Sequence, residues 1–379
     1  MTEFFTTFFS LDNIFITTIV PFLFVLTVVV FVHEMGHYLV GRWCGIGVRE
    51  FSIGFGPELV GFNDSHGTRW KLSAIPLGGY VKFLGDMSVT SDPGAQETDL
   101  LSDQEKKHAF HLQPVWKRAA TVFAGPLFNF LLTIAVFAVM FSIYGKTVSE
   151  PTVAEIRPDS PAQAAGFQPG DRFVSVDGRE VETFSDVQRL VSGRAGDPIV
   201  FVMARGDEEV TLTATPEIVE QTDALGNTIR IGVIGVVNNE ELGQPRLVTF
   251  NPIEATGEAI SETGHIIVRT AQFLQRFASG REDRCQLGGP VRIAEMSGQA
   301  AALGFEWLVQ LVALLSVGIG FLNLLPIPPL DGGHLVFYGL EAAMRRPVSE
   351  RIMEFVYRIG LILVLGFMLF VFWNDLFGC

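Results

Sequence analysis

Three titratable residues stand at the end of a long apolar segment near the N-terminus. No charged residue lies between Ile14 and Val32, and His33, Glu34 and His37 follow directly. On a helix, residues i and i+4 share a face, so both imidazoles point to one side. Two histidines with this spacing can bind one zinc ion, and the glutamate beside them can act as a base on water. We therefore predict a zinc peptidase centre inside a membrane, because two ordinary core histidines would leave Glu34 unexplained.

A catalytic zinc ion usually takes three protein ligands and keeps one position open. Candidates for the third ligand lie at the end of the apolar segment 307–330, where Pro326 and Pro328 interrupt the helical pattern. We predict that Asp331 binds the metal, because the two glycines after it allow a close approach. His334 is the alternative, although it lies past the turn. The prediction is one zinc ion per chain, bound by His33, His37 and Asp331.

The rest of the chain indicates an α-helical polytopic membrane protein with about four transmembrane helices. Of the 379 residues, 48% are hydrophobic, and the mean hydropathy of +0.35 is high for a soluble protein. Besides the first segment, apolar stretches cover residues 119–145, 307–330 and 359–373. The last is short for a span, so Arg358 must extend its charge to the membrane surface. A formal net charge of −14 argues against nucleic acid as a partner.

Lysine and arginine residues near the ends of the spans predict the orientation of the protein. They follow the first span, precede the second, and separate the third from the fourth. Those loops are expected in the cytoplasm, with the N-terminus and residues 144–306 outside and the zinc motif toward the cytoplasmic side. No cleavable signal peptide is expected, since cleavage after the first apolar run would remove the zinc motif. Cysteines are too few for a disulfide framework, and a Cys44–Cys285 bridge would join opposite sides.

Two further regions have patterns of their own. Residues 48–84 alternate partly between apolar and polar side chains, which predicts membrane-associated β-hairpins beside the metal. A cytoplasmic β-subdomain with no catalytic part is the alternative. Residues 86–107 are polar and predict a linker. A strand-like tail over 228–236 and an amphipathic helix over 251–278, packed on the core or on the membrane surface, precede the third span.

A soluble α+β domain is predicted between the second and third spans. Residues 152–215 read as a strand, a short capped helix, a strand and turn, a helix and a hairpin. The motif Ser160-Pro-Ala, Ala165-Gly-Phe, Pro169-Gly-Asp-Arg and Val176-Asp-Gly resembles a bacterial PDZ domain. Such domains bind extended peptides or chain ends at a sheet edge. We therefore divide the chain into membrane core (1–145), PDZ domain (146–218), strand tail and amphipathic helix (219–304), and the second part of the core (305–379).

The order of the motifs resembles a known family. The zinc motif on the first span is followed by Gly125-Pro126-Leu-Phe-Asn129 on the second and by a segment from Asn323 to Asp331-Gly on the third. With shorter matches at 117–120 and 287–294, the pattern resembles the site-2 protease family of intramembrane metalloproteases over nearly the whole chain. The PDZ insertion is most similar to the branch that contains the bacterial regulators of sigma-E. Enterobacterial members carry tandem PDZ domains, whereas one is evident here.

The resemblance implies a function and roles for individual residues. Glu34 would be the general base, Asn323 would bind the scissile main chain or the developing oxyanion, and Asn129 would support substrate binding and helix packing. The expected location is a bacterial inner membrane with a periplasmic PDZ domain. The expected partners are membrane lipid and single-span client proteins, either anti-sigma factors or remnant signal peptides.

Two other functions are consistent with parts of the sequence. A non-enzymatic membrane adaptor could recruit envelope proteins through its PDZ domain, but it would have no use for Glu34 or Asp331. A zinc transporter would place acids and histidines along a path through the membrane, whereas the sequence concentrates them in one cluster. Hydrolysis of peptide bonds in transmembrane segments is therefore the predicted function.

Overall fold

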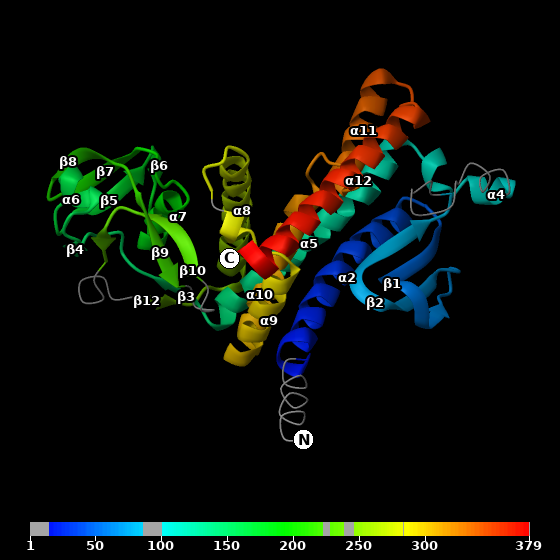
Figure 1. Ribbon diagram of the computed structural model, residues 1–379, viewed down its shortest axis with the longest axis horizontal. Helices are drawn as coiled ribbons and strands as arrows, with labels where there is room; N and C mark the ends of the chain where they lie inside the picture. The colour runs from blue at the N-terminus through cyan, green and yellow to red at the C-terminus, as the bar shows by residue number, and fades with distance from the viewer. Residues whose placement is uncertain (1–14, 86–100, 223–227, 239–245, 283, 379) are drawn as a thin grey trace. The chain divides into compact units, whose positions relative to one another are not determined.

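The computed structural model describes residues 15–85, 101–222, 228–238, 246–282 and 284–378 (Figure 1). These residues form two compact units. The first comprises residues up to 137, residues 259–267 and residues from 287 onward, and the second comprises residues 138–258 and 268–286. Part of the linker predicted over 86–107 lies outside the described residues, and its remainder contains the short helix α4 (Asp103–Lys106).

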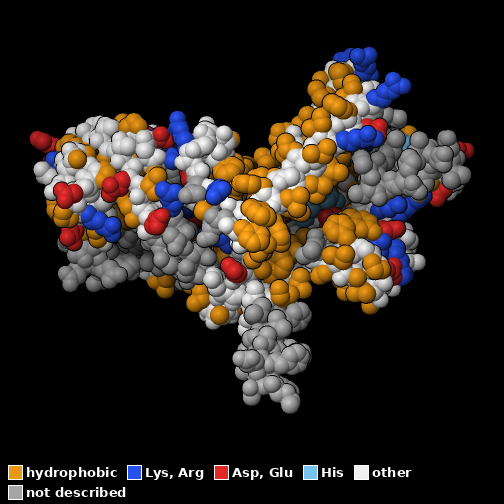
Figure 2. All heavy atoms as spheres, in the orientation of Figure 1, with side chains coloured by type: hydrophobic (Ala, Val, Ile, Leu, Met, Phe, Trp, Pro, Cys, Tyr) orange, Lys and Arg blue, Asp and Glu red, His pale blue; other side chains and the backbone are white. Residues whose placement is uncertain are grey.

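Four helices of the described chain are long and apolar enough to cross a membrane, so the protein is a multi-pass membrane protein. They are α2 (Val20–Trp43), α5 (Val115–Ile143), α10 (Phe305–Asn323) and α12 (Glu350–Trp373). Helices suit the bilayer because they satisfy their backbone polar groups internally. The fourth span begins earlier than predicted, because its helix starts before Arg358, which pairs with Glu354 one turn away on the same helix. Figure 2 shows hydrophobic side chains along α12.

Small residues bring the helices of the first unit close together. A Cβ at Gly36 of α2 would lie 2.3 Å from the carbonyl oxygen of Ala124 of α5. Helices α9 (Pro290–Leu303) and α10 both pack on α2. Close approach through small side chains is how membrane helices gain packing energy without a hydrophobic driving force. This close packing places α5 against the face of α2 that carries His33 and His37.

A β-hairpin packs beside α2, as predicted from residues 48–84. Its strands β1 (Val48–Asn63) and β2 (Arg69–Phe83) are antiparallel, and Glu50 of β1 has both Lys82 and Arg69 of β2 as partners, so the sheet folds back on itself. Phe51 is buried and stacks on Trp70, with ring centroids 4.3 Å apart. Beyond this core the hairpin exposes large apolar side chains, namely Phe55, Leu59, Val60, Phe62, Leu72 and Ile75.

Asp64 fixes the turn of this hairpin to α2. Its carboxylate accepts hydrogen bonds from the hydroxyl of Tyr38 (2.8 Å), the indole of Trp70 (3.1 Å) and the backbone N–H groups of His66 and Thr68. Burial alone would raise the pKa of Asp64, but these hydrogen bonds outweigh it and hold the pKa well below its usual range. The side chain therefore stays ionised at neutral pH and ties the hairpin to the helix.

The second unit contains a small α+β domain with a four-stranded sheet. The strand order is β6-β5-β7-β8, with all described pairs antiparallel. Phe173, Ile199 and Phe201 are buried at its centre. Ser160 and Thr183 cap the two helices by accepting hydrogen bonds from backbone N–H groups of the first turn. The elements are α6 (Pro161–Ala165), β5 (Arg172–Val176), β6 (Arg179–Glu180), α7 (Phe184–Ser192), β7 (Ile199–Arg205) and β8 (Glu208–Ala214).

Three short strand pairs and a long helix complete the part between the second and third spans. The pairs are β3 (Lys146–Val148) with β12 (Arg246–Val248), β4 (Glu155–Ile156) with β11 (Val236–Val237), and β9 (Glu217–Thr222) with β10 (Thr228–Val233). The predicted amphipathic helix is present as α8 (Pro252–Ala278), capped by Asn251. Cys44 is free, so the alternative bridge from Cys44 to Cys285 is absent.

Candidate metal centre

His33, His37 and Asp331 meet at one point inside the first unit, although the acid is almost 300 residues away in the chain. The two Nε2 atoms are 3.2 Å apart, and Oδ2 of Asp331 lies 3.2 Å from that of His33 and 3.6 Å from that of His37. Three corners of a tetrahedral zinc site with metal–ligand distances of about 2.0–2.1 Å are separated by about 3.3 Å. The three atoms therefore have the spacing that one zinc ion requires.

One polar atom of this cluster also lacks the partner that a metal-free site would need. Oδ2 of Asp331 is buried and has no hydrogen-bond partner among the described residues. His33 and His37 are each only 8% exposed. Buried polar atoms are normally paired, and an unpaired one needs an explanation. A bound cation supplies it, so the residues present fit a zinc ion.

The sequence around Asp331 explains how the acid reaches the histidines. Helix α10 ends at Asn323, and helix α11 (Asp331–Met344) begins at the acid itself. The glycines that follow permit the tight turn, since a Cβ at Gly332 would lie 2.3 Å from the carbonyl oxygen of Leu324 and one at Gly333 would lie 2.5 Å from the nitrogen of Pro328. The glycine context was the basis for predicting Asp331, and the geometry agrees with it.

His334, the alternative third ligand, is not one of the three residues that meet at the candidate metal site. Its ring contacts the hydroxyl of Tyr357 on α12. It is not part of the group of ligand atoms formed by the two histidines and the acid. Because α11 starts at Asp331, His334 lies almost one turn further along the helix. It therefore joins α11 to α12.

Gly125 of α5 forms one wall of the site where His33, His37 and Asp331 meet. A Cβ at this position would lie 2.3 Å from Nε2 of His37 and 2.9 Å from Cε1 of His33. Any side chain larger than hydrogen would therefore occupy the space beside the ligand atoms. In the sequence this glycine belongs to the motif from Gly125 to Asn129, which does not by itself predict a part in the metal site. A glycine directly before Pro126 in an apolar segment is the one feature of the sequence that could have indicated a close approach at this position.

Helix α5 also contacts the second nitrogen of each imidazole. Nδ1 of His37 lies 2.9 Å from the carbonyl oxygen of Thr121. Nδ1 of His33 lies 3.3 Å from the side-chain amide of Asn129, which is fully buried. Thr121 was missed by sequence analysis, since a backbone carbonyl leaves no signature in residue type. Ligand histidines commonly use the other ring nitrogen in this way, and it fixes their orientation.

Glu34 lies between the three candidate ligand residues and strand β2. It interacts electrostatically with His33, His37 and Asp331, and it has a backbone hydrogen bond with Val81 of β2. A Cβ at Gly79 would lie 3.1 Å from Cγ of Glu34, so the strand passes directly beside the acid. The hairpin thus covers the side of α2 on which the glutamate lies.

Asn323 is half-buried at the last residue of α10. No hydrogen bond of its side chain is seen within the described ranges, so its amide is available to a ligand. It lies eight residues before Asp331, in front of the proline-containing segment. Its role at the scissile peptide remains a prediction.

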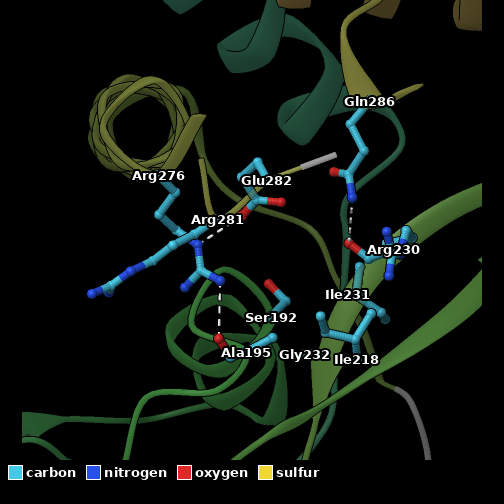
Figure 3. A pocket seen from close by; sticks show the side chains of 10 residues that line it. All are labelled: Ser192, Ala195, Ile218, Arg230, Ile231, Gly232, Arg276, Arg281, Glu282 and Gln286. Atoms are coloured by element: carbon cyan, nitrogen blue, oxygen red, sulfur yellow. Dashed lines mark hydrogen bonds and ion pairs between the residues drawn. The ribbon is translucent and has the colours of Figure 1, made fainter. Parts of the chain in front are cut away.

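The second unit has a polar pocket of its own between α7, β10 and the end of α8 (Figure 3). The guanidinium of Arg276 binds the carbonyl oxygen of Ala195 at 2.9 Å and the carboxylate of Glu282 at 2.7 Å. Gln286 reaches the carbonyl oxygen of Arg230. These contacts hold the end of α8 against the small domain, and the charge of Arg276 is neutralised within the pocket.

Comparison with known proteins is consistent with this geometry. The profile of Peptidase family M50 matches residues 21–367. A relative from Mesorhizobium japonicum with the provisional name zinc metalloprotease is 75% identical over 366 residues, covering 96% of this chain and all of its own length. A Brucella suis relative with the same provisional name is 61% identical over the full length of both chains.

Two further matches cover different shares of this chain. Metalloprotease MmpA of Caulobacter vibrioides is 39% identical over 384 residues, with 96% of both chains covered. The crystal structure of a PDZ domain from the SdrC-like protein of Listeria monocytogenes matches with 17% identity and a TM-score of 0.20, covering 26% of this chain and 93% of that one. The family profile and the full-length relatives decide the assignment: the chain belongs to Peptidase family M50 and is a metalloprotease.

Proposed function

We propose that the protein hydrolyses peptide bonds within transmembrane segments of client proteins, with zinc held by His33, His37 and Asp331. One observation carries the proposal. The three ligand atoms converge, with an unpaired carboxylate oxygen, in a unit built of helices long enough to cross a membrane. When bound, zinc acts as a Lewis acid that activates water and polarises a carbonyl group.

The residues of the chain supply the remaining chemistry. Glu34, beside the cluster, takes the proton of the attacking water and returns it to the leaving amine. Asn323 donates its amide to the main chain of the client or to the developing oxyanion. The Asp331 carboxylate would complete the ligand set, since its Oδ2 lies 3.2 and 3.6 Å from the Nε2 atoms of the two histidines. The burial of the histidines excludes bulk water from this side of the cluster.

A client helix must unwind before its carbonyls are accessible, and strand β2 is suited to hold the unwound segment. The strand pairs with β1 on one side, and near Gly79 and Val81 it runs beside Glu34. Addition of an extended segment to a sheet edge gives affinity through main-chain hydrogen bonds and tolerates many sequences. The client would then lie next to the general base.

The substrate class and the location follow from the resemblance to the sigma-E regulator branch of site-2 proteases. We infer single-span clients, either anti-sigma factors already trimmed outside the membrane or remnant signal peptides, in a bacterial inner membrane. The placement of basic side chains supports a cytoplasmic position for the turn between α11 and α12, where Lys and Arg gather in Figure 2. The PDZ-like domain would then be periplasmic and would restrict clients by size.

The test compares wild type with Glu34→Gln, using purified full-length protein and a model single-span substrate. We expect the variant to keep its zinc, measured by elemental analysis, and to lose cleavage by a factor of about 10²–10⁴, since general-base catalysis contributes about that much. His334→Ala is the control that should retain the metal. Normal turnover by Glu34→Gln would refute the proposed reaction.

A further inference from the structure

Asn129 is a buried polar residue whose side chain is directed at a metal ligand. It lies on α5 with 0% of its surface exposed. Its amide nitrogen is 3.3 Å from Nδ1 of His33, while its Oδ1 is buried with no partner among the residues described. An amide placed in this way needs an explanation, because both of its ends are usually paired when it is buried.

The chemistry of a ligand histidine supplies the explanation. A neutral imidazole that binds a metal through Nε2 carries its proton on Nδ1, and that N–H needs an acceptor. His37 has one in the carbonyl oxygen of Thr121, at 2.9 Å. His33 faces the amide of Asn129 instead. A half-turn of that amide exchanges its oxygen and nitrogen, which occupy nearly the same space, and brings the unpaired Oδ1 onto Nδ1 of His33.

We propose that Asn129 is the acceptor that holds His33 in its metal-binding tautomer and orientation. Asn129 is thus a positioning residue, which acts on the zinc site through His33 and makes no contact with the substrate. The inference rests on the metal site of the proposed function. It also gives α5 a consistent role: a backbone carbonyl orients one ligand, and a side chain orients the other.

The surroundings of Asn129 hold its side chain in this direction. Its backbone oxygen accepts hydrogen bonds from the hydroxyls of Ser316 (3.0 Å) and Thr133 (3.1 Å). Helix α10 comes very close at Gly320, where a Cβ would lie 3.0 Å from the Cβ of Asn129. The side chain is therefore confined between α2, α5 and α10, which is what a positioning group requires.

Two other roles predict different outcomes on substitution. If Asn129 only joined helices, its loss would lower the unfolding temperature of the metal-free protein and leave zinc affinity unchanged. If it bound substrate or the oxyanion, its loss would reduce turnover at unchanged zinc affinity. Only the positioning role predicts a change in the dissociation constant of zinc itself.

The experiment measures that constant for the full-length protein in detergent, by competition between the protein and a fluorescent zinc chelator. We expect Asn129→Ala to weaken zinc binding by about 10- to 100-fold, the range seen when such partners of ligand histidines are removed. Asn129→Asp should bind zinc within a few-fold of wild type, because a carboxylate also accepts from Nδ1–H. Ser316→Ala, which removes a bond to the backbone of Asn129 only, is the matched control and should leave the constant unchanged.

The outcomes separate this inference from the metal site on which it rests. Zinc affinity that is unchanged in Asn129→Ala would overturn the positioning role, and so would an Asn129→Asp protein that is folded and cannot bind zinc. The second variant preserves size and shape, so it decides the question if Asn129→Ala does not fold. A wild-type protein that binds no zinc would instead refute the metal site, whatever the variants do.

Discussion

Gly125 and His37 approach each other so closely that no side chain fits between them. A Cβ at Gly125 would lie 2.3 Å from Nε2 of His37, well inside the contact distance of two heavy atoms. Membrane helices often use glycine to bring backbones together. Here the glycine leaves room for the atoms of a metal ligand, so its role belongs to the site as much as to helix packing.

Gly125→Ala is expected to abolish zinc binding while the protein still folds. The added methyl group occupies the position of the His37 ring edge, so the imidazole must turn away from Asp331. Elemental analysis of the purified variant gives the zinc content, and size-exclusion chromatography in detergent gives the folded fraction. Gly318→Ala on α10 is the control, because a Cβ there has no atom within 4 Å. A Gly125→Ala protein with a full complement of zinc would contradict the geometry of the site.

Asp331→Asn is expected to lower zinc occupancy strongly, whereas His334→Ala should leave most of the metal in place. The carboxylate is the group that meets both histidines, while His334 contacts Tyr357. Zinc content after dialysis against a weak chelator distinguishes the two variants. If zinc content fell in His334→Ala and not in Asp331→Asn, the third ligand would be His334.

Asp64→Asn should destabilise the protein by about 1.5–3 kcal/mol at neutral pH, the usual contribution of hydrogen bonds to a charged group. The folded-state pKa of Asp64 lies below its unfolded value of about 3.9. The carboxylate therefore contributes its full stabilisation above about pH 4, and this contribution is lost as the pH falls further. Thermal unfolding in detergent, measured at pH 7 and pH 3, should show a smaller difference between variant and wild type at pH 3. A difference that does not change with pH would argue against an ionised Asp64.

A cysteine introduced at Asp207 should react with a membrane-impermeant thiol reagent added from the periplasmic side. The residue lies in the exposed turn between β7 and β8, and the charge pattern predicts that this domain is outside the cytoplasm. Arg346→Cys, in the turn between α11 and α12, should be protected under the same conditions. The opposite labelling pattern would reverse the proposed orientation.

Deletion of residues 150–216 should preserve cleavage of an already trimmed client and permit cleavage of a longer one. The metal ligands and Glu34 all lie in the first unit, and the small domain has its own buried core. Cleavage of trimmed and full-length forms of one client by the deletion variant provides the measurement. Loss of both cleavages would show that the domain is needed for the core to fold or act, and not as a size filter.

The features of this protein that can be predicted from residue order are those whose signal is local. Four apolar segments, the i and i+4 spacing of His33 and His37, and the proline and glycine residues around Asp331 all have direct structural consequences within a few residues. They are enough to predict the spans, the hairpin, the amphipathic helix and a cluster of three candidate metal ligands. The short capped helix that begins after Ser160 in the small domain is a further local signal of this kind.

The groups that support those candidate ligands become visible only once the chain is folded. Thr121 acts through a backbone carbonyl, Gly125 through the absence of a side chain, and Gly79 through the passage of a strand beside Glu34. None of these contributions depends on a chemically distinctive side chain, so residue types alone do not show what these positions contact. They arise from the close packing of α5 and β2 on α2, which brings together segments that are far apart along the chain.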